Sequence, residues 1–137
     1  MAQISVDGNY GIGFQNAAGS FVGNITINGS STTYNTSSDY RLKENIEDMV
    51  GATDRLKALK PINFAWKADG HRVDGFLAHE LQEVVPEAAT GTKDAVDEEG
   101  NPVYQGIDQS KLVPLLTKAL QEAVARIEAL EAKLTNS

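Results

Sequence analysis

Ser38 and Lys43 are the residues of this sequence whose types and spacing could carry out a reaction. A serine hydroxyl becomes a nucleophile when a nearby base takes its proton, and a neutral lysine can be that base. Neutrality requires that the amine be desolvated or lie near another positive charge, which Arg41 could supply. A turn could bring the two side chains within hydrogen-bond reach. On spacing alone, the competing interpretation is that Ser38 caps a helix beginning near Leu42 and that Lys43 is solvated.

The composition argues against several other kinds of site. The chain has 137 residues, a net charge of -7 and no cysteine, so disulfides, thiolate catalysis and cysteine-ligated zinc are excluded. The acidic charge is the wrong sign for general nucleic-acid binding, and no stretch approaches the roughly 18 to 20 apolar residues of a membrane span. His79 and Glu83 could offer two metal ligands, but a third is missing. We expect no cofactor, no metal, no nucleic-acid partner and no membrane partner.

Charge divides the chain into two parts. Residues 1–37 contain one charged side chain, Asp7, and are rich in Gly, Asn, Ser and Thr. Apolar and polar residues alternate there as in half-buried strands, at Ile4/Val6, Ile12/Phe14 and Ile25/Ile27. Turn dipeptides lie between these pairs, at Asp7-Gly8, Ala18-Gly19 and Asn28-Gly29. Such strands cannot close a core alone and would need to stack on further strands, from the same chain or from sister chains. A flexible linker is the alternative.

Residues 38–137 show alternating helix and strand signals, so an α+β fold is expected. The pattern predicts a helix over 44–59 ended by Pro61, a strand over 62–66, a turn at 68–70, a strand over 73–77, a helix over 79–85 and a hairpin about the acidic turn 97–102. Phe64 and Trp66 share one face of their strand and are expected in the core. Ser110 is expected to cap a long C-terminal helix, with Pro114 in its first turn.

The C-terminal helix carries an apolar stripe with the alternating spacing of three and four that is typical of a coiled coil. Its members are Val113, Leu116, Leu120, Ala123, Ile127, Leu130 and Leu134. Arg126 and Glu131 fall at g and the following e, where they would pair between parallel chains. The run 126–131 resembles a signature of three-stranded coiled coils, whereas Ile at a with Leu at d favours dimers. We give the ion-pair signature more weight. The alternative is that the stripe packs inside its own domain.

The run Ser38-Asp39-x-Arg41-Leu42-Lys43-x-Asn45-Ile46 resembles the signature of a family of intramolecular chaperone domains. These domains end bacteriophage tail fibres, tailspikes and neck appendages; they are the endosialidase-type chaperones, also classed as self-cleaving serine peptidases. The similarity covers about residues 38 to 137. It continues through Leu56-x-x-Leu59-x-Pro61, Phe64-x-Trp66, Gly75-Phe76-Leu77-Ala78-His79-Glu80-Leu81, Val85-Pro86-Glu87-Ala88 and the stretch from Tyr104 to Leu116.

The resemblance implies a homotrimer in which residues 38–137, with a parallel coiled coil over about 110–135, bring the fibre strands of three chains into register. Residues 1–37 would be the end of the fibre, and thus the chaperone's partner within its own chain. A single-turnover cut by Ser38 and Lys43 would then release the chaperone. The mature fibre would belong to the virion and serve host attachment, while the chaperone would act in the host cytoplasm. The alternative is a structural trimerisation module that is never cut.

The resemblance places the cut at the junction formed by Ser37, Ser38 and Asp39. The family is usually cleaved between serine and aspartate. Attack by the Ser38 hydroxyl on its own carbonyl would require a strained four-membered ring. Attack on the carbonyl of Ser37 closes a five-membered ring and shifts the acyl group from nitrogen to oxygen. Both bonds remain candidates.

Overall fold

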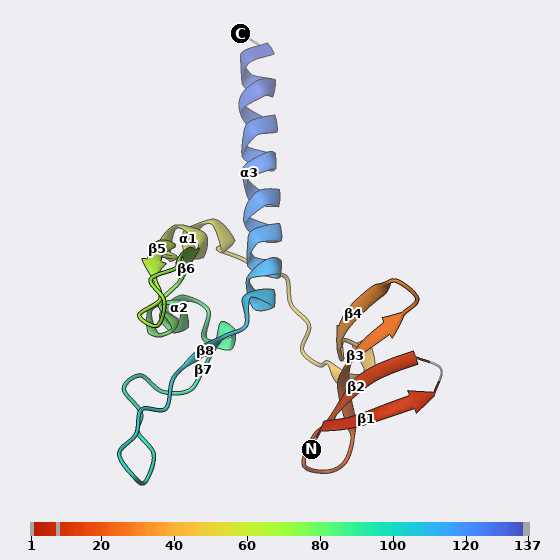
Figure 1. Ribbon diagram of the computed structural model, residues 1–137. Coiled ribbons are helices and arrows are strands. Elements are labelled where there is room, and N and C mark those ends of the chain that lie inside the picture. Colours follow the sequence, from red (N-terminus) through yellow and green to blue (C-terminus); the bar gives the residue numbers. More distant parts are fainter. Residues whose placement is uncertain (1, 8, 136–137) are drawn as a thin grey trace. The chain divides into compact units, whose positions relative to one another are not determined.

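The computed structural model describes residues 2–7 and 9–135 and divides into two compact units, Met1–Glu47 and Asp48–Ser137. The expected mixture of helix and sheet, with a long C-terminal helix, is confirmed (Figure 1). The strands are β1 (Ala2–Asp7), β2 (Asn9–Gln15), β3 (Phe21–Asn28), β4 (Ser31–Thr36), β5 (Ile62–Ala65), β6 (Arg72–Gly75), β7 (Ala89–Thr90) and β8 (Gly106–Ile107). The helices are α1 (Ala52–Ala58), α2 (Ala78–Val84) and α3 (Leu112–Thr135), with short 3-10 turns η1 (Tyr40–Leu42), η2 (Pro86–Ala88) and η3 (Gln109–Lys111).

The first unit is an antiparallel meander in the order β1-β2-β3-β4. The three alternating pairs predicted as strands lie in β1, β2 and β3, so the linker alternative is wrong. β4 was not predicted, because its sequence STTYNT contains one large apolar residue and no alternation. Gly29 has a positive φ of 60° in the predicted turn between β3 and β4. Gly8, in the first predicted turn, lies outside the described residues.

Over residues 11–36, apart from Asn28, this sheet buries no large apolar side chain in one chain. Over residues 11–47, apart from Asn28, Gly23 is the one buried residue. Large apolar side chains are exposed on its strands, namely Ile12, Phe14, Phe21, Val22, Ile27 and Tyr34. Burying apolar surface is the main favourable term in folding. A single copy of this sheet therefore leaves most of that stabilisation unused, which agrees with the expectation that it stacks on further strands.

The second unit packs α1, α2 and the first half of α3 around a small core. The buried members are Ala52, Leu81, Val85, Ala88, Leu112, Leu115 and Ala119. The predicted strand pair 62–66 and 73–77 forms the β5–β6 hairpin, and the predicted helix 79–85 is α2. β7 and β8 were not predicted, because each contributes only two residues to a ladder.

The predicted helix over 44–59 is half wrong, because helix α1 begins only at Ala52. Asn45 and Gly51 have positive φ values of 50° and 67°, which a right-handed helix cannot accommodate. Glu122 of α3 then caps the new start: its carboxylate accepts hydrogen bonds from the backbone N–H groups of Ala52 at 3.3 Å and Thr53 at 2.9 Å. The capping residue lies 69 residues further along the chain than Thr53, so a local sequence pattern cannot predict this cap. The predicted end before Pro61 is confirmed.

Two further local expectations are corrected. Asp108, rather than Ser110, caps η3 at the entrance to α3, since its Oδ1 accepts from the Ser110 backbone N–H at 3.0 Å and from its hydroxyl at 2.6 Å. Trp66 is not in the core: it is 56% exposed and packs edge-on against Phe64, with ring centroids 5.1 Å apart. Pro114 lies in the first turn of α3, as predicted.

The acidic turn 97–102 closes as a small loop. Val96 and Pro102 form an isolated antiparallel bridge, and the Asp97 N–H donates to the Asn101 carbonyl at 2.9 Å. The side chain of Asp97 also accepts from the backbone of Glu99 and Asn101. The predicted hairpin is thus present, with a single bridge in place of strands.

Candidate functional site

Ser38 and Lys43 are in direct contact. Lys43 Nζ donates a hydrogen bond to Ser38 Oγ across 2.8 Å, a normal length for such a bond. The η1 turn brings them together, because the Leu42 N–H donates to the Asp39 carbonyl and the Lys43 N–H to the Tyr40 carbonyl, each at 3.1 Å. Of the competing interpretation, the cap at Ser38 is wrong, because Asp39 caps the turn, whereas the exposure of Lys43 agrees with it.

Asp39 is the residue that caps this turn. Its Oδ1 accepts from the backbone N–H of Arg41 at 2.9 Å. The Arg41 guanidinium donates two further hydrogen bonds to the same carboxylate, from Nε to Oδ1 at 2.9 Å and from Nη2 to Oδ2 at 2.8 Å. Such two-pronged arginine–carboxylate contacts are among the stronger hydrogen bonds in proteins. The sequence pattern did not predict this two-bond contact between Asp39 and Arg41, although the Asp-x-Arg spacing is present in it.

The contact between the Arg41 guanidinium and the Asp39 carboxylate shifts the pKa values of both side chains. The Arg41 side chain, and after it the Arg41 backbone N–H, lowers the pKa of Asp39 below its ordinary value, with a smaller contribution from the charge on Lys43. The carboxylate in return raises the pKa of Arg41. Arg41 is therefore not the unpaired positive charge beside Lys43 that the sequence suggested, because its charge is matched by Asp39.

Ser37 ties the upstream side of the junction to the sheet. Its backbone N–H and its hydroxyl both donate to the carbonyl of Val22 in β3, at 3.2 and 3.1 Å. On the downstream side, Asp39 is held by its hydrogen bonds within the η1 turn. Ser38 therefore lies between two anchored residues, with its hydroxyl on the lysine amine. This arrangement can pass a proton between Ser38 and Lys43 next to either candidate peptide bond.

Both partners of this pair are exposed in one chain. A charged lysine in water is in its stable form, and burial is one way to favour the neutral amine that a general base requires. The single chain supplies the hydrogen bond but leaves the amine open to solvent.

The predicted coiled-coil stripe is exposed along its whole length. α3 uses a different face to pack on its own unit, through Leu112, Leu115 and Ala119. The alternative, in which the stripe packs inside its own domain, is thus contradicted. Stripe exposures are 58% for Val113, 47% for Leu116, 66% for Leu120, 55% for Ile127, 59% for Leu130 and 78% for Leu134, and Ala123 is also exposed.

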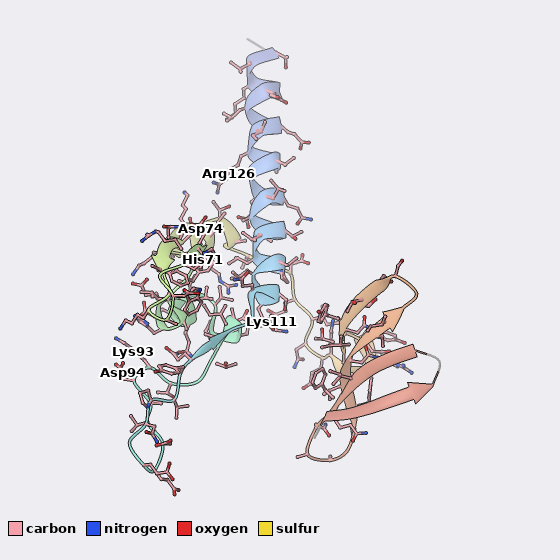
Figure 2. The ribbon with its side chains drawn as sticks, in the orientation of Figure 1. His71, Asp74, Lys93, Asp94, Lys111 and Arg126 are labelled. Atoms are coloured by element: carbon pink, nitrogen blue, oxygen red, sulfur yellow. The ribbon has the colours of Figure 1, made fainter. Side chains whose placement is uncertain are left out.

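The outer half of α3 extends beyond α1 as a lone helix (Figure 1). Arg126 lies on this part of the helix (Figure 2), and both it and Glu131 are exposed, as the g and e positions of a coiled coil would be before assembly.

Over residues 2–7 and 9–135, no group of three His, Asp or Glu side chains is placed to hold a metal ion. In that same part of the chain, no helix has the length and apolar character needed to cross a membrane.

Comparison with known proteins places part of this sequence in a family. The family model named Peptidase_S74, described as the chaperone of endosialidase, matches residues 38–90. The match begins at Ser38 itself. Residues 38–90 therefore belong to the endosialidase-chaperone family, which its name classes as a peptidase family. The resemblance stated from the sequence motifs is confirmed for this segment.

Two curated relatives are phage fibre proteins. The chain is 32% identical over 102 residues, 71% of its length, to the long tail fiber protein Gp37 of Enterobacteria phage K3 and to that of Enterobacteria phage T2. It spans 8% and 7% of the length of these relatives, respectively. The chain thus resembles a small portion of a long fibre protein.

Proposed function

We propose that residues 38–137 are a trimerising intramolecular chaperone that registers the fibre strands of residues 1–37 and is then released by its own Ser38–Lys43 peptidase. The observation that supports this most is the 2.8 Å hydrogen bond from Lys43 to Ser38, at the residue where the family match begins. The division into residues 1–37 and 38–137 follows the change in charge and the start of that match.

The cutting step is a serine attack assisted by lysine. Neutral Lys43 takes the hydroxyl proton as Ser38 Oγ bonds to the Ser37 carbonyl carbon. The Ser37–Ser38 peptide bond then breaks, and the lysine ammonium returns the proton to the Ser38 nitrogen. This leaves an ester from Ser37 to Ser38 Oγ, which water hydrolyses. Cleavage of the Ser38–Asp39 bond would need a different geometry or a different nucleophile, so the proposal commits to the junction.

Trimerisation rests on the exposed stripe of α3. Roughly three heptads are marginal as an isolated coiled coil, so contacts between the globular parts would contribute to holding three chains together. The Arg126–Glu131 pairs would add at most about 1 kcal/mol each at an exposed position, which biases parallel register without driving assembly.

Because the Ser38–Lys43 pair is exposed in one chain, the rate of cutting would depend on assembly. Burial of the pair by sister chains would desolvate the amine and favour its neutral form. One chain alone would then hold the pair in hydrogen-bond contact but cut slowly. Release would follow only after the strands had been registered.

The proposed location follows from the relatives, which are long tail fibre proteins. Residues 1–37 would remain in the virion tail fibre, and the chaperone would act in the host cytoplasm during assembly. Homotrimeric sister chains and the fibre segment of the same chain would be its partners.

Fresh expression followed by SDS gel electrophoresis and mass spectrometry tests the proposal. Wild type should give two fragments, and the larger should begin at Ser38 or Asp39. Ser38→Ala and Lys43→Ala should each leave one intact band. Lys67→Ala, which removes a lysine outside the junction, should be cut as wild type.

A second candidate is a trimerisation module that is never cut, which the exposure of Ser38 and Lys43 in one chain favours. A single wild-type band that persists for days would support this function and contradict the peptidase.

A further inference from the structure

Asp39 and the lysine that the proposed reaction needs cap the two ends of the three-residue turn η1. The Arg41 side chain and backbone N–H are the main causes that lower the pKa of Asp39, and the charge on Lys43 makes a smaller contribution. The hydrogen bond of Lys43, however, goes to Ser38. Both oxygens of Asp39 are held by Arg41 instead: Oδ1 accepts from the backbone N–H and from Nε, and Oδ2 accepts from Nη2.

We propose that Arg41 is a positioning residue that sequesters the Asp39 carboxylate, so that Lys43 stays bonded to Ser38 and can give up its proton. This inference rests on the proposed self-cleavage. A free carboxylate beside a lysine stabilises the ammonium form, which cannot act as a base. A planar guanidinium binds a carboxylate through two parallel bonds, whereas an ammonium offers a single point of charge. Arg41 therefore outcompetes Lys43 for Asp39.

Few other groups in this unit could produce the same effect. The turn is tied to β3 through Ser37 and Val22, and β2, β3 and β4 contain no charged residue. Their titratable side chains are the phenols of Tyr10 and Tyr34. Besides Asp39, the carboxylates of residues 1–47 are Asp7, at the end of β1, and Glu44 and Glu47, which follow Lys43 along the chain. Glu44, as the nearest of these in sequence, provides a matched control.

The experiment measures the rate of self-cleavage as a function of pH. Full-length chains are pulse-labelled by cell-free translation at a chain concentration that permits assembly, transferred at that concentration into buffers from mildly acidic to strongly alkaline, and followed on SDS gels. The variants are Arg41→Gln, the double variant Asp39→Asn/Arg41→Gln, and the control double variant Glu44→Gln/Arg41→Gln. Arg72→Gln controls for the loss of one positive charge outside the junction.

Arg41→Gln should move the midpoint of the rate profile to higher pH by about one unit, the effect of one adjacent opposite charge. At pH values below the midpoint this is roughly a tenfold slower cut. Adding Asp39→Asn should return the midpoint to that of wild type, because the released carboxylate is gone. Adding Glu44→Gln should leave the shift in place, and Arg72→Gln should behave as wild type.

A structural role for Arg41 predicts a different outcome. If Arg41 only holds the turn, Arg41→Gln should lower the rate at every pH without moving the midpoint, and Asp39→Asn should fail to restore it; either result overturns the inference. Failure of wild type to cut at any pH would overturn the proposed function itself. Cutting by wild type with an unshifted Arg41→Gln profile would overturn the sequestering role alone.

Discussion

At the scale of single residues, the junction depends on short-range contacts. Ser38 and Lys43 are five positions apart, and the Asp39 cap with its two-bond Arg41 contact folds the intervening turn. Contacts this local form without the docking of distant segments, so their loop-closure cost is small. Residue types and spacing allowed a contact between Ser38 and Lys43 but left the capped-helix alternative open, and the family resemblance is what pointed to this pair. The role of Arg41 was not predictable, because spacing does not say which carboxylate it will bind.

A prediction at the scale of single residues concerns Glu122. It accepts hydrogen bonds from both backbone N–H groups at the start of α1 and from the Thr53 hydroxyl, and the Thr53 bonds lower its pKa below the ordinary value of 4.5. Glu122→Gln should lower the melting temperature of the protein at neutral pH by a few degrees. Glu128→Gln, on the exposed side of the same helix, should leave it unchanged.

The pH dependence of this effect has a definite sign. Because the pKa of Glu122 is lower in the folded chain than in the unfolded chain, its contribution is fully present above the unfolded pKa. The contribution is lost as the pH falls through the folded pKa. The difference in melting temperature between wild type and Glu122→Gln should therefore be full at neutral pH and vanish in strong acid. A difference that stays constant down to low pH would contradict the carboxylate cap.

At the scale of elements, α3 presents two apolar faces in different surroundings. Leu112, Leu115 and Ala119 face the core of their own unit, whereas the coiled-coil stripe faces solvent. The stripe was predictable because a heptad repeat is a property of the sequence alone. Its exposure was not, because the core-facing residues are also apolar and only packing separates the two faces. The start of α1 was missed for a similar reason, since its cap comes from α3.

The two faces predict opposite mutational behaviour. Leu115 is 1% exposed and Leu120 is 66% exposed. Leu115→Ala should destabilise the fold by roughly 2–5 kcal/mol in denaturant titrations, the usual result of deleting a buried leucine side chain. Leu120→Asn should leave the fold of one chain intact but make the chains dissociate in sedimentation experiments.

The same comparison can refute the assignment of faces. If Leu120→Asn unfolds the chain in the manner of Leu115→Ala, with no separate effect on association, the stripe is not an assembly surface.

At the scale of the whole molecule, the described residues expose more large apolar side chains than they bury. Both units show such exposed apolar side chains, and in the proposed assembly sister chains would bury them. Intertwined fibre strands pair distant or separate segments and so form slowly, whereas a chaperone that has already joined three chains raises the effective concentration of those strands. In this proposal, cutting afterwards would make reversal slow and leave the fibre kinetically trapped.

The mass of the uncut assembly tests this account most directly. Sedimentation equilibrium of the Ser38→Ala chain, which lacks the proposed nucleophile, should report three times the chain mass of 14.7 kDa, and the mass should hold as the protein is diluted through the micromolar range. A particle of one chain mass, folded and stable at those concentrations, would contradict the account, because nothing would then cover the stripe or register the strands.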